Sequence, residues 1–291
     1  MNGRVAVVTG ATSGLGRHVA IGLAARGATT VIVGRGAERI ARVAGEIRQE
    51  TGSSQVEAVA VTDLAVRSEM RRVADDVLQR YSKVHVLVNN AGGFFARRET
   101  TADGLERTFA LNVLAPFVLT SLLTPRLRAS APARVVQVAS AAHQGYPASL
   151  EDLQSQGRYR GFQVYGRSKL ELILLTREFA RRLAGSGVTV NAVHPGFVHS
   201  GFGQNNGGGI AVTIRVLGAL FGRSERKGAD TPLFVATDPS LSEVTGQYFA
   251  NRRVRPGSVP SNDVGAARRL FAECASLGQI SELPDPNVTG R

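Results

Sequence analysis

The chain has 291 residues, of which 43% are hydrophobic and 20% charged, so it is long enough to bury a substantial core. Its formal net charge is +12, but the arginines are scattered in short pairs and are not interleaved with aromatic residues, so no nucleic-acid partner is expected. The single cysteine, Cys274, excludes an internal disulfide, and the five dispersed histidines predict no metal site.

The amino terminus passes from Met1 almost directly into the strand-like run 5–8, which leaves no room for a signal peptide. No apolar run approaches the about 20 residues that a membrane span requires. These features predict a cytoplasmic protein without stable membrane insertion.

Apolar runs rich in β-branched residues alternate with helical patterns through the first 250 residues, which is typical of a parallel sheet covered by helices on both faces. Right-handed crossovers make this a doubly wound, Rossmann-type α/β fold with a mostly parallel sheet of about seven strands. The expected strands are 4–9, 29–33, 56–61, 84–89, 134–139, 188–193 and 246–249. The expected helices are 14–26, 36–50, 67–81, 102–128, 163–185 and 228–237, with Pro116 and Pro125 kinking or shortening the fourth.

No linker divides the chain, so residues 1–282 are expected to form one domain. Residues 200–227 differ, because three glycines at 207–209 precede a mostly apolar run, and this composition predicts a substrate loop or lid. The end of the chain, 283–291, is expected to be a disordered tail.

The first strand ends in a glycine-rich turn that leads directly into a helix. Glycines let the backbone turn tightly and approach a pyrophosphate, whose charge the helix amino terminus favours. Such a turn could serve strand-to-helix packing alone, but its position after the first strand of a βαβ unit predicts a dinucleotide site. The candidate residues are Gly10, Thr12, Ser13, Gly14, Leu15 and Gly16.

Residues after the second and third strands bear on the choice of cofactor. An acidic residue at the end of the second strand would bind the ribose 2′-hydroxyl of NAD, but Arg35 stands there and can pair with a 2′-phosphate. The expected cofactor is therefore NADP(H), although Arg35 could also be a solvated arginine of an arginine-rich chain. Asp63, followed by Leu64, could place a carboxylate near the adenine amino group or cap a helix.

Tyr165 and Lys169 stand four residues apart in a helix-forming run, so their side chains share one face. An ammonium near a phenol favours the phenolate and lowers the phenol's pKa from about 10 toward the working range. Only three of the 35 basic residues are lysines, which suggests that this position needs a compact ammonium. A pair with this spacing also arises by chance on helix surfaces.

Together with the motifs below, these features make the chain closely resemble the short-chain dehydrogenase/reductase family over nearly its whole length. The matching motifs are the glycine-rich turn, Asn89-Asn90-Ala91-Gly92, Asn112, Ser140, Tyr165-x-x-x-Lys169 and Pro195-Gly196. The resemblance implies an NADP(H)-dependent oxidoreductase that interconverts a carbonyl and an alcohol on a small-molecule substrate.

The resemblance also implies a catalytic tetrad. Tyr165 would exchange a proton with the carbonyl oxygen, to which Ser140 would also hydrogen-bond. Lys169 would bind the nicotinamide ribose and lower the pKa of Tyr165, while Asn112 would hold a water of a proton relay. Asn112 could instead bond backbone inside a helix, and Ser140 could cap a strand end.

For the remaining motif residues the resemblance implies contacts around the cofactor. Asn90 would brace neighbouring strands, and Ala91 and Gly92 would leave room for the cofactor. The nicotinamide pocket would be shaped by Pro195, Gly196 and Val198, with Ser200 offering a hydroxyl to the carboxamide.

The segment between Ser140 and Tyr165 is longer than in many family members. With Ala141-Ala142-His143 and His194-Pro195-Gly196, it resembles the retinol dehydrogenase branch, which implies a lipophilic aldehyde, alcohol or ketone. Aromatic residues that could line an apolar pocket, or pack in the core, are Phe94, Phe95, Tyr146, Phe162, Phe197 and Phe202. His143 and His194 could assist catalysis, but as lone histidines they are interpreted as structural residues.

Two rival functions remain at this point. One is a regulator or sensor that binds NADP(H) without turnover, and the other is a nucleic-acid binder with salt-dependent affinity. Family analogy further implies a homodimer or homotetramer packed through the helices at 102–128 and 163–185.

Overall fold

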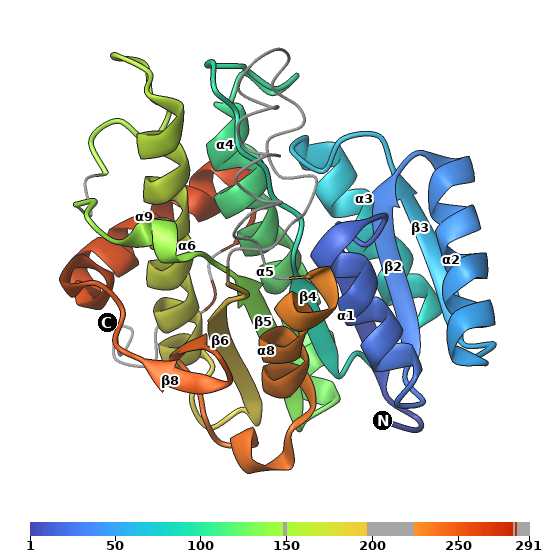
Figure 1. Cartoon of the computed structure of the whole chain (residues 1–291). Helices are drawn as coiled ribbons and strands as arrows, with labels where there is room; N and C mark the ends of the chain where they lie inside the picture. The colour runs from blue at the N-terminus through green and yellow to red at the C-terminus, as the bar shows by residue number, and fades with distance from the viewer. Residues whose placement is uncertain (148–149, 197–223, 282, 284–291) are drawn as a thin grey trace.

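The computed structural model describes residues 1–147, 150–196, 224–281 and 283. In this part of the chain, one sheet has the strand order β3-β2-β1-β4-β5-β6-β7-β8 (Figure 1). Neighbouring strands are parallel up to β7, and β7 and β8 are antiparallel. The strands are β1 Val5–Thr9, β2 Thr29–Arg35, β3 Val56–Val61, β4 Val86–Asn89, β5 Ala133–Val138, β6 Val188–His194, β7 Tyr248–Ala250 and β8 Arg253–Arg255. The predicted doubly wound α/β fold is confirmed, with β8 as an additional edge strand.

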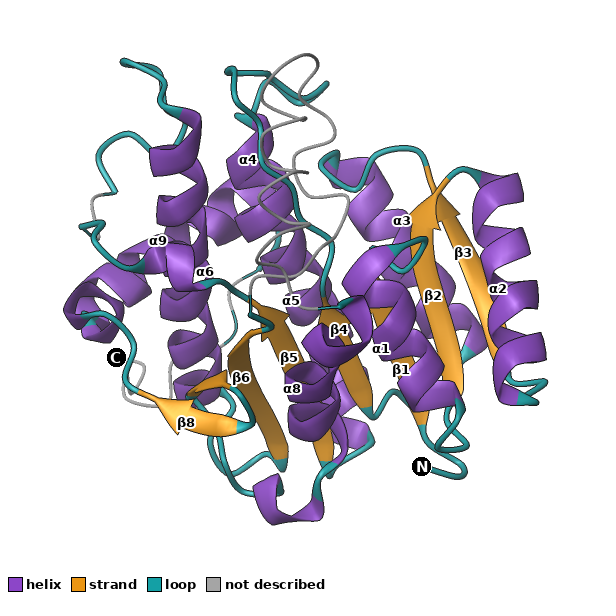
Figure 2. Cartoon of the chain, viewed as in Figure 1, coloured by secondary structure: helices purple, strands orange, loops and turns teal. Residues whose placement is uncertain are grey.

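Helices cover both faces of the sheet (Figure 2). Along β1, Val7 faces the core beneath one helical layer, and Ala6 and Val8 face the core beneath the other. The first layer contains α3 Arg67–Arg80, α5 Ala115–Ala129, α6 Gly161–Arg182 and α9 Val264–Gly278. The second contains α1 Gly14–Ala24, α2 Ala37–Thr51 and α8 Glu225–Thr237. Both layers are therefore built on strands whose two faces are apolar, as parallel sheets require.

The helix predicted over 102–128 is composite. It begins as the short α4, Arg107–Phe109, continues as a π-helical turn, Ala110–Leu114, and becomes α5, which contains Pro125 without ending there. Pro116 lacks an N–H, so it cannot donate to the carbonyl four residues earlier. This coincides with the change from π-helical to α-helical geometry.

The run 107–129 also corrects the expectation that no apolar segment approaches the length of a membrane span. It is 23 residues long, and its most apolar stretch of 18 residues has a mean hydropathy of 1.5, which meets the length and composition of a span. However, 83% of its most apolar stretch is buried inside the protein, as in the core helix of a globular fold.

Helix α9 was not predicted, although its sequence carried the signal. Asp263 accepts a hydrogen bond from the Ala266 amide as the helix cap, and buried residues recur at helical spacing: Ala266, Ala267, Leu270, Phe271, Cys274 and Ala275. The Phe271 ring meets Phe117 of α5 at 4.8 Å and Phe179 of α6 at 4.9 Å between ring centroids. Helix α9 thus covers part of the α5 and α6 surface through which assembly with another copy was expected.

Candidate active site

The glycine-rich turn after β1 has the backbone geometry and the exposed donors of an anion site. Gly10 and Gly14 have φ of +68° and +60°, which only glycine adopts without strain. Ser13 precedes α1 but does not cap it with its side chain, and the first turn of α1 contains no acidic residue. Its amide N–H groups are therefore suited to a pyrophosphate.

Asn90 braces this turn, as predicted. Its side-chain amide donates to the carbonyls of Thr9 and Gly10 at 2.9 and 3.2 Å. The Thr9 hydroxyl accepts from the amides of Asn90 and Ala91, both at 3.0 Å. A Cβ on Gly16 would stand 2.4 Å from both the Asn90 side-chain nitrogen and the Gly10 carbonyl oxygen, so this position has no room for a side chain. The role of Thr9 was missed, because a threonine at a strand end carries no distinctive signal.

Arg35 lies at the carboxyl end of β2 and is exposed to solvent. No hydrogen bond or ion pair joins its guanidinium to another residue in the described ranges. Gly36 and Thr62 line a hollow of about 430 Å³ beside it. The guanidinium is therefore accessible to an anionic group.

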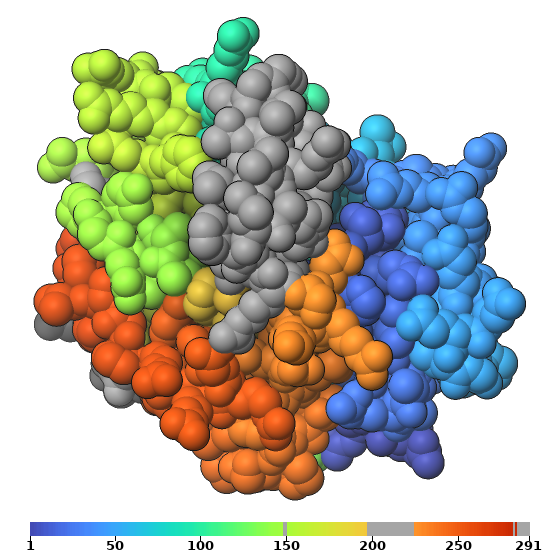
Figure 3. Space-filling model, viewed as in Figure 1, coloured from blue at the N-terminus to red at the C-terminus, as the bar shows by residue number. Residues whose placement is uncertain are grey.

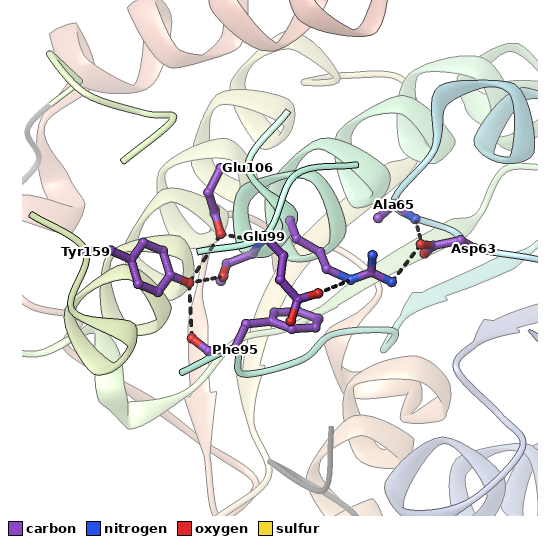
Figure 4. A network of polar contacts seen from close by, with 8 residues as sticks. Asp63, Ala65, Phe95, Glu99, Glu106 and Tyr159 are labelled. Carbon is purple, nitrogen blue, oxygen red and sulfur yellow. Dashed lines mark hydrogen bonds and ion pairs between the residues drawn. The ribbon is translucent and has the colours of Figure 1, made fainter. Parts of the chain in front are cut away.

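Asp63 lies in the turn between β3 and α3. Its carboxylate accepts from the Ala65 amide at 3.0 Å and forms an ion pair of 2.7 Å with Arg107 (Figure 4). Helix α3 begins at Arg67, so Asp63 stabilises a turn before the helix and does not cap it. Leu64 is buried in the core beside it. The proposed adenine contact stays a prediction, with Asp63 already held by Arg107.

Arg107 connects this turn to the segment after β4. Its guanidinium also lies 3.5 Å from the Glu99 carboxylate and 5.3 Å from the centre of the Phe95 ring. Phe95 is buried beneath it. The loop 93–99 is thereby tied to the start of α4 (Figure 4).

Ser140, Tyr165 and Lys169 are brought together at the carboxyl edge of the sheet. Ser140 stands two residues beyond β5, and the other two lie one turn apart on α6. The side chains of Ser140 and Tyr165 are hydrogen-bonded. The Lys169 ammonium donates to the Val138 carbonyl at 2.9 Å and lies 5.6 Å from the centre of the Tyr165 ring. Ser140 also accepts from the Ala142 amide at 3.2 Å, so it caps the following turn as well.

Asn112 lies in the π-helical turn, and its side chain is fully buried. Its amide nitrogen donates to the Gly93 carbonyl at 2.9 Å, and its oxygen accepts from the Gly93 amide at 2.8 Å. The nitrogen also donates to the Ser168 hydroxyl at 3.0 Å, and that hydroxyl donates to the Tyr165 carbonyl. The alternative that the Asn112 side chain bonds to the backbone is thus confirmed. Ser168, which connects Asn112 to the backbone of Tyr165, was not predicted from the sequence.

Burial dominates the titration of the Tyr165 and Lys169 pair. It raises the pKa of Tyr165 to about 12, against which the hydrogen bond from Ser140 acts in the opposite direction. It lowers the pKa of Lys169 to about 8. Burial sets the direction of the Tyr165 shift, and the lowering of this pKa by the Lys169 ammonium stays a prediction.

Some of the aromatic residues predicted to line a pocket lie in the described part of the chain, and others lie outside it. Phe94 stacks on Phe162 at 4.7 Å between ring centroids and meets the Tyr165 ring edge-on at 6.2 Å. The Tyr146 ring lies against α6, since a Cβ on Gly166 would come within 2.1 Å of it. The predictions at Phe197, Val198, Ser200, Phe202 and most of the loop 200–227 lie outside the described residues, as do 284–291 of the predicted tail. Pro195 and Gly196 follow β6 directly.

The long segment between Ser140 and Tyr165 is anchored by a network around Glu106 (Figure 4). The buried Glu106 carboxylate caps α4 by accepting from the amides of Thr108 and Phe109 at 2.8 and 2.7 Å. The Tyr159 hydroxyl lies 3.3 Å from this carboxylate and donates to the Phe95 carbonyl at 3.1 Å. Sequence reasoning missed Glu106, whose only sequence signal was an acidic residue before an apolar helical run.

Comparison with known proteins agrees with this geometry. The profile of the short chain dehydrogenase family matches residues 4–208. Retinol dehydrogenase 12 of Mus musculus is 40% identical over 277 residues, which covers 95% of this chain and 87% of that protein. A crystal structure of a Mycobacterium paratuberculosis protein is 33% identical, with a TM-score of 0.77 over 97% of this chain and 96% of that one. The Pseudomonas aeruginosa RhlG/NADP active-site complex is 27% identical, with a TM-score of 0.68 over 90% and 96% of the two chains.

The chain therefore belongs to the short-chain dehydrogenase/reductase family, in the retinol dehydrogenase-like branch. Membership of this family makes it an NAD(P)-dependent oxidoreductase that acts on CH–OH groups.

Proposed function

We propose that this protein uses NADPH to reduce a lipophilic aldehyde or ketone, or NADP⁺ to oxidise the corresponding alcohol. The observation that carries the proposal is the hydrogen-bonded pair of Ser140 and Tyr165 hydroxyls, with Lys169 one helical turn away. This pair lies at the edge of the sheet where the glycine-rich turn begins α1.

The chain offers groups suited to each part of the cofactor. The uncapped amides of α1 fit the pyrophosphate, and the accessible Arg35 fits a 2′-phosphate. Gly92 has no side chain beside Lys169, and a Cβ there would stand 3.1 Å from the Asn112 side-chain oxygen and 3.5 Å from the ammonium nitrogen. When bound, the cofactor supplies the hydride, and Lys169 would hold its ribose hydroxyls.

Tyr165 would then manage the proton. With its pKa raised to about 12, the phenol is protonated at neutral pH and can donate to a carbonyl oxygen as that oxygen gains charge. The Ser140 hydroxyl would give the same oxygen a second hydrogen bond. In the reverse direction the phenolate would accept the proton of the alcohol.

Asn112 would serve the relay through its backbone, because its side chain is committed to Gly93 and Ser168. Pro116 has no N–H to donate to the Asn112 carbonyl, which leaves that oxygen available to bond a water. Such a water would connect the buried Lys169 ammonium with solvent.

An apolar substrate is favoured by the aromatic residues around the phenol. Phe162 precedes Tyr165 by one turn of α6 and remains 62% exposed, while Phe94 fills the space between their rings. Large exposed aromatic surface at an active site is suited to binding apolar ligands. The name of the similar retinol dehydrogenase 12 agrees with a substrate of this kind.

The test is NADPH consumption, with NADH in parallel, against a panel from small ketones to long-chain aldehydes and retinal. Tyr165→Phe should lower kcat by about 10²- to 10⁴-fold, because the proton donor is lost. Tyr159→Phe is the matched control, since burial also raises the pKa of Tyr159 to about 12 but its hydroxyl bonds Glu106 and Phe95. NADPH binding without turnover of any substrate would contradict the proposal and favour a regulator or sensor.

Cofactor preference is tested separately. Arg35→Ala should weaken NADPH binding by at least about tenfold and leave NADH binding nearly unchanged, because only NADPH carries the 2′-phosphate. Arg42→Ala on the exposed face of α2 is the control, because its guanidinium pairs with Glu46. Equal losses for both cofactors in Arg35→Ala would exclude the 2′-phosphate role.

We also propose a cytoplasmic location and a homodimer or homotetramer. Because α9 occupies part of the α5 and α6 surface, assembly through these helices would use the area beside it. Light scattering of the full chain and fractionation of expressing cells test the two proposals.

A further inference from the structure

The turn that carries Ser140 is held by a buried histidine three residues further on. His143 Nδ1 lies 2.7 Å from the Ser140 carbonyl oxygen, and its Nε2 lies 3.1 Å from the Ser258 amide nitrogen. A backbone amide can only donate, so Nε2 must accept. The proton of the neutral ring is then on Nδ1 and is donated to Ser140. One imidazole thus joins the Ser140 backbone to a residue 118 positions later.

The surroundings of His143 favour this neutral form. Its side chain is completely buried, and its ring meets the Tyr248 ring of β7 at 4.9 Å between centroids. Burial and the positive charge of Arg177 on α6 lower the pKa of His143, whereas its bond to Ser140 acts in the opposite direction. Protonation of the His143 ring would also place an N–H at Nε2, which would face the Ser258 N–H and break this hydrogen bond. The geometry and the charges therefore select one tautomer.

The segment that contains Ser258 is itself fastened to α6. The Arg177 guanidinium donates to the Ser261 hydroxyl at 3.0 Å and to the Asn262 side-chain oxygen at 2.7 Å. In Figure 3 the green surface after β5 adjoins the orange-red C-terminal segment on the same face of the molecule. The partner of His143 is thus a fixed part of the fold.

A second imidazole supports the other side of the turn. His194, the last residue of β6, accepts from the Ala141 amide through Nδ1 at 3.2 Å. Ser140, Ala141 and Ala142 therefore all have a backbone group bonded by a side chain within or beside the turn. This leaves the Ser140 hydroxyl little freedom to move relative to Tyr165.

We infer that His143 is a positioning residue for Ser140, acting as a neutral imidazole that fixes the Ser140 backbone to the segment beginning at Ser258. This inference rests on the proposed function, in which the Ser140 hydroxyl orients the carbonyl oxygen. It assigns the long C-terminal extension beyond β8 a role in the geometry of the active site.

Three substitutions of His143 separate its two bonds. His143→Asn retains a donor near the position of Nδ1, and His143→Gln retains an acceptor near that of Nε2. His143→Phe keeps a ring and loses both bonds. Because His143 acts through its bond to Ser140, kcat should decrease in the order wild type, His143→Asn, His143→Gln and His143→Phe. The loss should reach up to about a hundredfold for His143→Phe. The NADPH dissociation constant should remain nearly unchanged, because His143 touches no part of the glycine-rich turn.

The decisive measurement is a double-mutant cycle with Ser140→Ala. If His143 acts through Ser140, adding His143→Phe to Ser140→Ala should change kcat by less than about twofold. The same fractional loss in both backgrounds would overturn the inference, as would equal kcat values for the Asn and Gln variants. Should His143→Phe fail to fold, as judged by NADPH binding and thermal unfolding, the cycle is run with His143→Gln.

The cycle also separates this inference from the proposed function. If Ser140→Ala leaves turnover unchanged, the proposed role of Ser140 is wrong and the inference falls with it. If Ser140→Ala reduces turnover but His143→Phe has an additive effect, only the inference fails.

Discussion

The cofactor-side turn, residues 9–16, and the substrate-side turn, residues 140–143, lie at the same edge of one sheet but are stabilised differently. The first is shaped by glycine backbone and by Thr9 and Asn90 at adjacent strand ends. The second is held by the imidazoles of His143 and His194, and so depends on β6 and on the chain beyond β8. The turn proposed to bind the cofactor thus relies on its own glycines and on Asn90 at the end of the adjacent strand β4, whereas the turn proposed to orient the substrate relies on β6 and on the chain beyond β8.

The two turns also differ in electrostatics. The first combines uncapped helix amides with the exposed Arg35, which suits an anionic ligand. Beside the second, burial raises the pKa of Tyr165 and lowers that of Lys169, and both shifts favour the neutral side chain. The first turn is suited to a negatively charged ligand, and beside the second the Tyr165 phenol keeps its proton at neutral pH.

The largest expected effect on stability comes from the C-terminal region. Phe271→Ala removes a ring packed between Phe117 and Phe179 and should lower the free energy of unfolding by about 3–5 kcal/mol. The exposed Val264→Ala should change it by less than about 0.5 kcal/mol. Urea unfolding measures both. If the comparison holds, the folded Phe271→Ala protein loses turnover more than NADPH affinity, and the reverse pattern would contradict it.

A smaller destabilisation with the opposite functional pattern is expected at the cofactor-side turn. Gly16→Ala forces a Cβ against the Asn90 side chain and the Gly10 carbonyl, which should cost about 1–3 kcal/mol and sharply weaken NADPH binding. Gly45→Ala in α2 is the matched control, because a Cβ there meets nothing within 4 Å. We expect that control to be neutral or stabilising by up to about 1 kcal/mol. Fluorescence titration measures NADPH binding by both variants, and equal NADPH affinities would contradict the prediction.

Tyr159→Phe should cost less again, about 1 kcal/mol, because Glu106 keeps its two backbone donors when the phenol is lost. Thermal unfolding in parallel with Tyr165→Phe gives the comparison. We expect Tyr159→Phe to affect mainly stability and Tyr165→Phe mainly turnover. A loss of turnover in Tyr159→Phe as large as in Tyr165→Phe would remove the distinction between them.

A further effect concerns the dependence of stability on pH. The pKa of Lys169 falls from 10.5 to about 8 on folding, so between these values the unfolded chain binds more protons than the folded protein. The contribution of Lys169 to the free energy of unfolding should therefore rise with pH in this window and be lost as pH falls through 8. Relative to Lys169→Met, wild type without cofactor should gain at most about 2 kcal/mol between pH 8 and 9.5. Parallel pH dependences of the two proteins in urea unfolding would show that the Lys169 pKa is not displaced.

The sequence by itself determined the doubly wound sheet, the glycine-rich turn and the pairing of Tyr165 with Lys169. Each rests on a local rule: apolar strand runs, the backbone freedom of Gly10 and Gly14, and the four-residue spacing of one helical turn. The helical spacing of Leu270, Phe271 and Cys274 indicates α9 in the same way, although this helix was not predicted.

Only the tertiary structure decided what surrounds these elements. The bonds of His143 to Ser258, of Tyr159 to Glu106 and of Asn112 to Ser168 join residues more than 50 positions apart, so no local pattern announces them. The titration of Tyr165 could not be read from its spacing to Lys169 either, because it depends on how completely the packed chain excludes water from both groups. Spacing along a helix sets which side chains can meet, and packing sets the dielectric environment in which they do.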